Sequence, residues 1–342
     1  MAVVKDEAYG HGALAVARTA LDCGASFLGV STLDEALPLR EAFPDSRILL
    51  LGERPPEELE WCVRHHLDCC LQHLDTALEL NRLAEMARTP ARVHLKIDTG
   101  MSRYGVRWHE APALAQKIHE SDWVRLEGVM SHFAQSDEAD KTFALLQRNR
   151  FHEVLDALEA RHIQVPLRHL CNSGGFLDLP HAHYDMVRCG ILPLGVYPSK
   201  VCRRLPGLRP VMQVKSRIAS IQNIQPGDSV GYGMRWKANA PRRIGVLPFG
   251  YGDGYPRLRN QGHVLVHGRP APIIGANAMD AVMVDLTDHP EARLWEDAVL
   301  LGTQGSEEIT VHDVAAWGGT VSYDILTGWR ARLPRLYLGA SL

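Results

Sequence analysis

Ionisable and hydrogen-bonding side chains follow several short apolar segments in the first part of the chain. They are Lys5, Lys96, His132, the pair Asn172 and Ser173, and Arg188. A lysine in such a place can bind a phosphate group, form a Schiff base with a substrate or hold pyridoxal phosphate, because burial lowers the pKa of its amine and frees the nitrogen as a nucleophile. Residue types and spacing alone do not choose among these three uses.

The elements that must position these side chains are predicted by hydrophobic periodicity. Short apolar runs alternate with stretches in which apolar residues recur every three or four positions. The runs occupy residues 2–5, 27–30, 48–51, 69–72, 93–96, 126–132, 168–173 and 186–191. Continuous apolar strands that alternate with helices predict an α/β fold, a (β/α)8 TIM-like barrel. The carboxyl ends of barrel strands meet at one mouth, so the polar side chains that follow them are expected to share one site.

A different pattern begins at about Pro206. Strand-like runs such as RIGVLPFG and GHVLVHG are separated by turn segments such as QPGD, which predicts a mostly β domain. The intervening segment 194–209 is rich in Pro and Gly. We therefore expect the barrel in residues 1–200 and the C-terminal β domain in residues 201–342.

Composition excludes several classes of protein. The 342 residues carry a formal net charge of -3, so no basic excess indicates nucleic acid as a partner. The seven cysteines are odd in number and form no C-x-x-C pair, which favours the cytoplasm over a disulfide framework. No apolar run approaches the length of a membrane span. The His and Cys residues of RHHLDCC (64–70) are spaced so that their side chains diverge, and no metal site is expected there.

The segment AVVKDEAYGHG (2–12) resembles the cofactor-lysine motif of the alanine racemase family, pyridoxal phosphate enzymes of fold type III. Further segments resemble other motifs of that family, in the same order along nearly the whole chain. They are LKIDTGMSRYGV (95–106), MSHFAQSDE (130–138), CNSGG (171–175), VRCGI (187–191), FGYGDGYPR (249–257), AMDAVMVDL (278–286) and TVSYDIL (320–326). Together, these motifs in the correct order identify the chain as a member of the family.

The resemblance implies a role for each matching residue. Lys5 would bind pyridoxal 5'-phosphate and act as the base on one face of the substrate, while Tyr251, paired with His132, would act on the other. Arg188 would face the pyridine nitrogen, and a guanidinium cannot accept a proton from it. Lys96 would be the lysine that is carbamylated in many members and orients Arg103. The other implied contacts are Tyr9, Arg103, Asn172, Ser173, Gly190, Ile191 and Tyr323 for the cofactor, and Arg103 and the Met279 backbone for the substrate.

The implied activity is racemisation of L-alanine to D-alanine by two bases, which supplies D-alanine for peptidoglycan. The implied assembly is a head-to-tail homodimer with shared active sites, in which Tyr251 and Met279 act on the partner's Lys5. Two alternatives stay open: a broad-specificity or serine racemase of the same fold, and a catalytically impaired protein that binds the cofactor. A decarboxylase of this fold type would place an acid, not Arg188, at the ring nitrogen.

The chain departs from the family pattern at several positions. Asp6 and Glu7 replace the usual Ala-Asn, and we expect both acids to point away from Lys5 toward the start of the next helix, where acids suit the helix dipole. Leu194 and Ala276 replace a tyrosine and an arginine, which would alter the substrate entrance. Family members usually carry roughly 35 residues before this lysine, and without them the helix that covers the eighth strand of the barrel is expected to be missing.

Three further side chains are expected to support loops and not to react. Asp98 and Asp253 lie in turn-rich motifs and are predicted to orient those loops. His11 follows Tyr9 in the Tyr-Gly-His-Gly segment and is predicted to hold the loop behind it.

Overall fold

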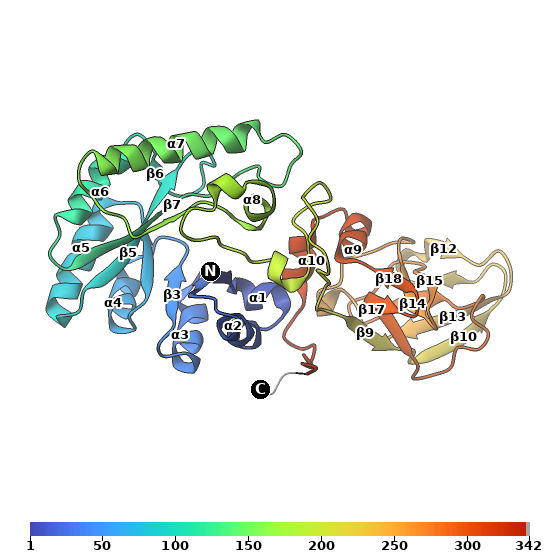
Figure 1. The fold of residues 1–342 in the computed structure, drawn as a ribbon. Coiled ribbons are helices and arrows are strands. Elements are labelled where there is room, and N and C mark those ends of the chain that lie inside the picture. The colour runs from blue at the N-terminus through green and yellow to red at the C-terminus, as the bar shows by residue number, and fades with distance from the viewer. Residues whose placement is uncertain (340–342) are drawn as a thin grey trace. The chain divides into compact units, whose positions relative to one another are not determined.

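The structure, a computed structural model, describes residues 1–339. The chain divides into two compact units, Met1–Leu208 and Arg209–Leu342, and the division falls within the Pro- and Gly-rich segment (Figure 1).

The first unit is built on a parallel sheet in which neighbouring strands follow one another along the chain. The strand order is β1-β2-β3-β4-β5-β7-β8, and the short strand β6 (Val106–Arg107) pairs with β5. The expected TIM-like barrel architecture is confirmed. The strands are β1 (Ala2–Val3), β2 (Phe27–Val30), β3 (Arg47–Leu50), β4 (Asp68–Leu71), β5 (Ala91–Asp98), β7 (Val124–Met130) and β8 (Leu167–His169).

The eighth position of the sheet is taken by an irregular segment. One parallel bridge joins Ala2 to Cys189. The Val3 N–H donates to the Cys189 carbonyl at 2.9 Å, and on the opposite side the Arg188 N–H donates to the Cys171 carbonyl at 3.0 Å. The prediction of a regular strand over 186–191 is wrong, because the backbone pairs at single points and turns at Gly190 into the 3-10 turn η2 (Leu192–Leu194).

Helices follow most of the strands, and Figure 1 shows α4, α5, α6 and α7 outside the parallel strands. Their apolar faces pack on the sheet; Leu80, Ala115 and Phe151 are fully buried there. Burial of such a large apolar side chain contributes about 1.5–3 kcal/mol. The helices are α2 (Ala13–Asp22), α3 (Leu33–Ala42), α4 (Pro56–Arg64), α5 (Leu74–Ala87), α6 (Ala111–His119), α7 (Thr142–Glu159) and α8 (Ser173–Asp178). After the irregular segment, only η2 precedes the linker in this unit.

The second unit is mostly antiparallel sheet, as expected. One sheet has the order β10-β13-β16, another has the order β15-β14-β17-β18 with β9 beside β17, and β11 pairs with β12. The strands are β9 (Val214–Arg217), β10 (Ser220–Ile224), β11 (Ser229–Val230), β12 (Trp236–Lys237), β13 (Arg242–Leu247), β14 (His263–Val266), β15 (Arg269–Pro272), β16 (Val282–Asp285), β17 (Asp297–Gln304) and β18 (Glu307–Ile309). Two helices follow, α9 (Val311–Gly318) and α10 (Ser322–Gly328). Within residues 1–339, no helix combines the length and apolar character that crossing a membrane requires.

Candidate active site

Lys5 begins an unusual left-handed turn at the carboxyl end of β1. In this element, α1 (Lys5–Gly10), the φ angles of Asp6, Glu7, Ala8 and Tyr9 are 51°, 55°, 48° and 54°. A left-handed conformation costs a residue other than glycine roughly 1–2 kcal/mol. Such strain persists only where the surroundings enforce it, and it is concentrated at functional sites.

Two glutamate side chains bind the backbone of this turn and of the helix that follows it. Glu35 accepts the Asp6 N–H at 2.7 Å, and Glu7 accepts the Ala13 N–H at 3.0 Å, at the first residue of α2. Glu7 therefore caps the following helix, as its position beside a helix start predicts. The His11 Nδ1 lies 2.9 Å from the Tyr9 carbonyl, so this ring holds the turn behind Tyr9 as expected.

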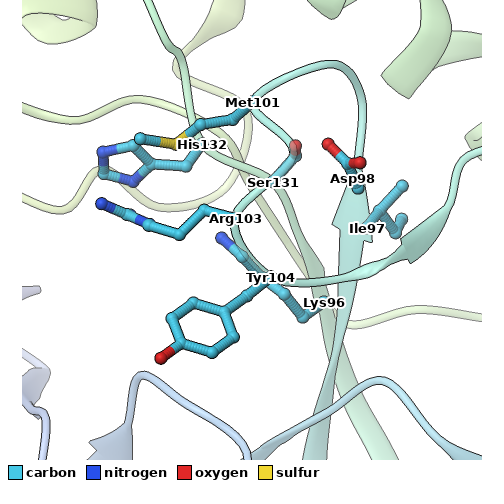
Figure 2. Close-up of a pocket in the computed structure, with 8 residues that line it drawn as sticks. All are labelled: Lys96, Ile97, Asp98, Met101, Arg103, Tyr104, Ser131 and His132. Carbon is cyan, nitrogen blue, oxygen red and sulfur yellow. The ribbon is translucent and has the colours of Figure 1, made fainter.

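A pocket at the mouth of the barrel is lined by side chains from β5, from the loop after it, and from the end of β7. Figure 2 shows the Lys96 amine and the Arg103 side chain near one another on the side of the pocket where the His132 ring lies. Asp98 also lines the pocket, but its carboxylate accepts the Gly100 and Ser102 N–H groups at 2.9 and 3.0 Å. Asp98 thus orients the loop that carries Arg103, which confirms its predicted role.

Lys96 is almost completely buried on β5. Burial, and then the nearby charge of Arg188, lowers the pKa of its amine to about 7, although Cys70 opposes part of the shift. An amine with this pKa is largely unprotonated just above neutral pH and can act as a nucleophile.

Arg188 is buried beside Ser131 and His132, two of the residues that line the pocket. Its guanidinium donates to the backbone carbonyls of His169, Ser131 and Leu170 at 3.0, 2.7 and 3.0 Å. Burial lowers its pKa to about 10, so it stays protonated at neutral pH. These bonds fix the plane of a side chain that can only donate.

His132 is oriented by Arg188. The Arg188 Nη2 lies 3.2 Å from the His132 Nδ1, and a guanidinium can only donate, so Nδ1 is the acceptor and Nε2 carries the ring proton. Burial, followed by the charge of Arg188, holds the pKa of this imidazole well below its usual range. The Asn172 Nδ2 lies 3.5 Å from the His132 Nε2 and is itself a donor, since the Asn172 Oδ1 accepts from Ser136 and Gly175. His132 thus lies between two donors, with the shorter contact at Nδ1 and the longer one at Nε2.

The ends of β1, β8 and the irregular segment build a small polar cradle. A β-carbon at Gly190 would lie 2.2 Å from the Tyr9 hydroxyl oxygen, so only glycine fits against that phenol. The Gly190 N–H donates to the Ser173 hydroxyl at 3.2 Å, and Ile191 follows directly. Burial, followed by the charge of Asp6, raises the pKa of Tyr9 to about 12, so the hydroxyl keeps its proton as a donor.

Two buried histidines beneath Arg188 were not among the predicted site residues. The His169 Nδ1 lies 3.0 Å from the Arg188 Nη1, and the His169 Nε2 lies 2.9 Å from the His94 Nδ1. Both rings are completely buried. The signal in the sequence was a histidine within each of two predicted strand runs, VHLK and RHL.

The remaining predicted residues lie in the second unit. Tyr251 begins the 3-10 turn η4 (Tyr251–Asp253), and its N–H donates to the Ala278 carbonyl at 3.2 Å, beside the exposed Met279. Asp253 accepts the Gly250 N–H at 2.8 Å and also bonds to Arg332, which confirms that it orients this loop. The fold thus brings Tyr251 and Met279 onto adjacent turns. Tyr323 lies on α10.

Comparison with known proteins decides the family. The profile described as "Alanine racemase, N-terminal domain" matches residues 1–198, and "Alanine racemase, C-terminal domain" matches residues 211–337. This chain belongs to the alanine racemase family. Proteins of this family are amino-acid racemases, a class of isomerase, and the chain is an enzyme of that class.

Relatives and solved structures cover nearly the whole chain. It is 44% identical over 326 residues to the alanine racemase of Syntrophobacter fumaroxidans, covering 95% of this chain and 87% of the relative. It is 40% identical to that of Halothermothrix orenii, covering 98% and 89%. The alanine racemase structure from Streptomyces coelicolor A3(2) superimposes with a TM-score of 0.92 at 37% identity, covering 99% and 91%. That from Clostridium difficile 630 has a TM-score of 0.92 at 31% identity, covering 97% and 87%.

Proposed function

We propose that this racemase interconverts L- and D-alanine with pyridoxal 5'-phosphate, using Lys5 and Tyr251 as its two bases. The observation that supports the proposal best is the composition of the barrel mouth. A lysine, a buried guanidinium and a polar cradle converge there from separate strand ends, and relatives that are 40–44% identical are named alanine racemase.

The donor set at the mouth fits the proposed cofactor. The cradle of Tyr9, Ser173 and the backbone at Gly190 and Ile191 suits a phosphate, because glycine at position 190 lets the Tyr9 hydroxyl lie directly against this backbone. Lys5 would bind the cofactor covalently. Arg188 would contact the ring nitrogen, with Arg103, Asn172 and Tyr323 as the other proposed contacts. When bound, the cofactor supplies an electron sink that makes the α-proton of an amino acid more acidic.

Two bases are needed because racemisation removes a proton from one face of the α-carbon and returns one to the other face. Lys5 would hold or release the proton on one face, and the phenol of Tyr251 would do so on the opposite face. The Met279 backbone and Arg103 would bind the substrate carboxylate. Tyr251 and Met279 lie on adjacent turns of the second unit, which suits a base and a substrate contact that act together.

His132 and Arg188 would tune these bases. An unperturbed tyrosine has a pKa near 10 and is a weak base at neutral pH. A neutral His132 with its proton on Nε2 would donate a hydrogen bond to the Tyr251 phenolate and favour that charged form. Arg188 can donate to a ring nitrogen but cannot protonate it readily, which limits side reactions that need a fully protonated ring.

The proposed cellular setting is the cytoplasm, where the enzyme supplies D-alanine for peptidoglycan as a head-to-tail homodimer.

The direct test of the proposed reaction incubates the full chain and pyridoxal phosphate with L-alanine or L-serine and measures both D-enantiomers. D-alanine formed faster than D-serine supports alanine as the substrate. The reverse ranking supports a serine racemase, and cofactor binding with no D-product of either kind supports the impaired protein.

The cradle leads to a prediction at Gly190. Gly190→Ala is expected to weaken cofactor binding by ~10–100-fold and to lower the free energy of unfolding by about 1–3 kcal/mol, because its β-carbon would displace the Tyr9 phenol. Cofactor titration and urea unfolding measure the two effects. The control is Gly52→Ala, whose β-carbon would meet only the flexible end of Arg54 at 3.1 Å. Equal cofactor affinity in the two variants would argue against the cradle.

The lowered pKa of Lys96 leads to a second prediction. Its pKa of about 7 leaves a free amine at pH 8, and we expect that amine to react with CO2 and form a carbamate. Carbamate occupancy should fall as the pH drops below about 7, where the amine is protonated. Carbon-13 NMR of the full chain in labelled bicarbonate measures this, with Lys96→Met as the assignment control. A labelled signal that persists in Lys96→Met would assign the carbamate elsewhere.

A further inference from the structure

The carboxylate of Asp68 lies next to the histidine pair beneath Arg188, at the closed end of the barrel, which is the end opposite the mouth. Asp68 is the first residue of β4, at the end of the strand opposite the mouth, and its side chain is fully buried. Arg47 and Arg92 approach it at 2.5 and 2.7 Å. Burial alone would raise the pKa of Asp68, but its interactions with His94, Arg47 and Arg92 outweigh burial and lower it, so the group is ionised at neutral pH.

Two hydrogen bonds and one longer polar contact connect Arg188 to Asp68. The Arg188 Nη1 lies 3.0 Å from the His169 Nδ1, and the His169 Nε2 lies 2.9 Å from the His94 Nδ1. The His94 Nε2 lies 3.5 Å from the Asp68 Oδ2, which is an ion-pair distance, and this buried nitrogen makes no hydrogen bond within the described residues. A β-carbon at Gly128 would lie 2.4 Å from the His94 Nδ1, so β7 leaves room for this ring with a glycine.

Arg188 and Asp68, at the two ends of the series, impose the same direction of hydrogen-bond donation. Arg188 can only donate, so the His169 Nδ1 accepts, and a neutral His169 must carry its proton on Nε2. The His94 Nδ1 then accepts that proton, and a neutral His94 carries its own proton on Nε2. An ionised carboxylate can only accept, and Asp68 faces that Nε2. Burial, followed by the charge of Arg188, holds the pKa of His169 well below its usual range, in agreement with a neutral ring.

We propose that Asp68 and His94 are positioning residues for Arg188, acting through a one-directional series of two hydrogen bonds, from Arg188 to His169 and from His169 to His94, and a 3.5 Å contact of the His94 Nε2 with the Asp68 carboxylate. The series fixes both imidazoles as neutral Nε2–H tautomers and presents a lone pair at the His169 Nδ1. That lone pair holds the Arg188 guanidinium in the plane in which it faces the mouth. Charged residues at the closed end of a barrel usually serve stability alone, whereas Asp68 here is connected to the active centre.

The predicted effect of this series on catalysis rests on the proposed function, but the predicted tautomers of His94 and His169 do not. Nitrogen-15 NMR of the full chain with labelled histidine reads both tautomers, and coupling across the His169–His94 bond identifies its donor. The chain has 17 histidines, so the signals lost in His94→Gln and His169→Gln supply the assignment. Two Nε2–H rings, with His169 as the donor, are expected. A Nδ1–H tautomer or an imidazolium at either position at pH 7.5 overturns the proposal.

Asp68→Asn tests the function of the series. Loss of the charged acceptor should speed exchange of the His94 Nε2 proton with water and lower kcat for racemisation ~10-fold, with a smaller change in KM. The control is Asp185→Asn, which removes the partner of Arg168 at 2.7 Å but contacts neither histidine. Equal proton exchange and equal kcat in the two variants would overturn the positioning role.

A second variant keeps the test decisive if Asp68→Asn fails to fold. Gly128→Ala leaves the ion pairs of Asp68 in place, and its β-carbon would displace the His94 ring and crowd the Leu167 carbonyl of β8 at 2.9 Å. It should abolish the coupling between the two histidines and lower kcat to a similar extent. Coupling and kcat that both match the unmodified chain would contradict the proposal. If the chain has no racemase activity, the proposed function fails, and the NMR readouts still decide whether the series exists.

Discussion

Replacing Lys5 with alanine is expected to reduce kcat for alanine racemisation by at least ~10³-fold, the largest effect of any single substitution in the barrel. The side chain would serve both as the covalent attachment of the cofactor and as one of the two bases, and general acid–base catalysis alone contributes about 10²–10⁴-fold. Formation of D-alanine from L-alanine, and the visible absorbance of the bound cofactor, measure the two losses together. Thermal unfolding should change little, because Lys5 is only half-buried.

The matched control removes an amine far from the mouth. Lys117 is exposed on α6, where it pairs with Glu120 at 3.0 Å, and Lys117→Ala should retain full activity. If Lys5→Ala keeps more than about a tenth of the original kcat, a loss of less than about 1.4 kcal/mol in transition-state stabilisation, Lys5 is not the attachment residue. The left-handed turn at Asp6–Tyr9 would then need another explanation.

Replacing Tyr251 with phenylalanine is expected to lower kcat by ~10²–10⁴-fold while leaving cofactor absorbance unchanged. The substitution removes one hydroxyl group and keeps the ring. With one base left, the enzyme should still exchange the α-hydrogen of one enantiomer of alanine with solvent deuterium, but no longer invert it. Proton NMR in deuterated buffer follows exchange and inversion in the same sample.

The control for this substitution is Tyr232→Phe, which removes the hydroxyl of a tyrosine that is 70% exposed in the same unit. Exchange of both enantiomers in Tyr251→Phe, at the rate of the unmodified enzyme, would eliminate Tyr251 as a base. His132→Ala provides a linked check. Without a hydrogen bond from His132 to stabilise the Tyr251 phenolate, the pH–rate profile should shift to higher pH.

Much of the fold was predictable because burial leaves a periodic trace in the sequence. A parallel strand covered on both faces is apolar throughout, and its helices repeat their apolar positions with the helical period. The runs at 27–30 and 93–96 therefore marked β2 and β5. Because barrel sites lie at the carboxyl ends of strands, the positions of Lys96 and Arg188 after predicted strands indicated that both belong to the site.

The motif resemblance extended the predicted site beyond the barrel. Tyr251 and Met279 belong to a mostly β unit in which turn residues interrupt the strands, and periodicity by itself assigned them no chemistry. Only the ordered set of motifs connected them with Lys5. The structure adds that the turns carrying them are tied by backbone hydrogen bonds.

Other features were decided only by tertiary contacts. No local pattern predicts four consecutive positive φ angles at Asp6–Tyr9, because that conformation is unfavourable for each residue and is enforced by Glu35, which lies 29 positions from Asp6. The irregular segment at 186–191 looked like a strand because it is apolar, yet its neighbours β8 and β1 allow pairing only at single points.

By itself, the sequence determined the fold class, the family and the chemical types at the mouth, since these depend on composition, period and short motifs. Tertiary structure determined which groups touch: the phenol of Tyr9 against Gly190, and the series from Arg188 to Asp68. The two histidines of that series are 75 positions apart, and their direction of donation depends on what lies at each end. Hydrogen-bond direction is a property of a completed network, and a network of distant residues exists only after the chain has folded.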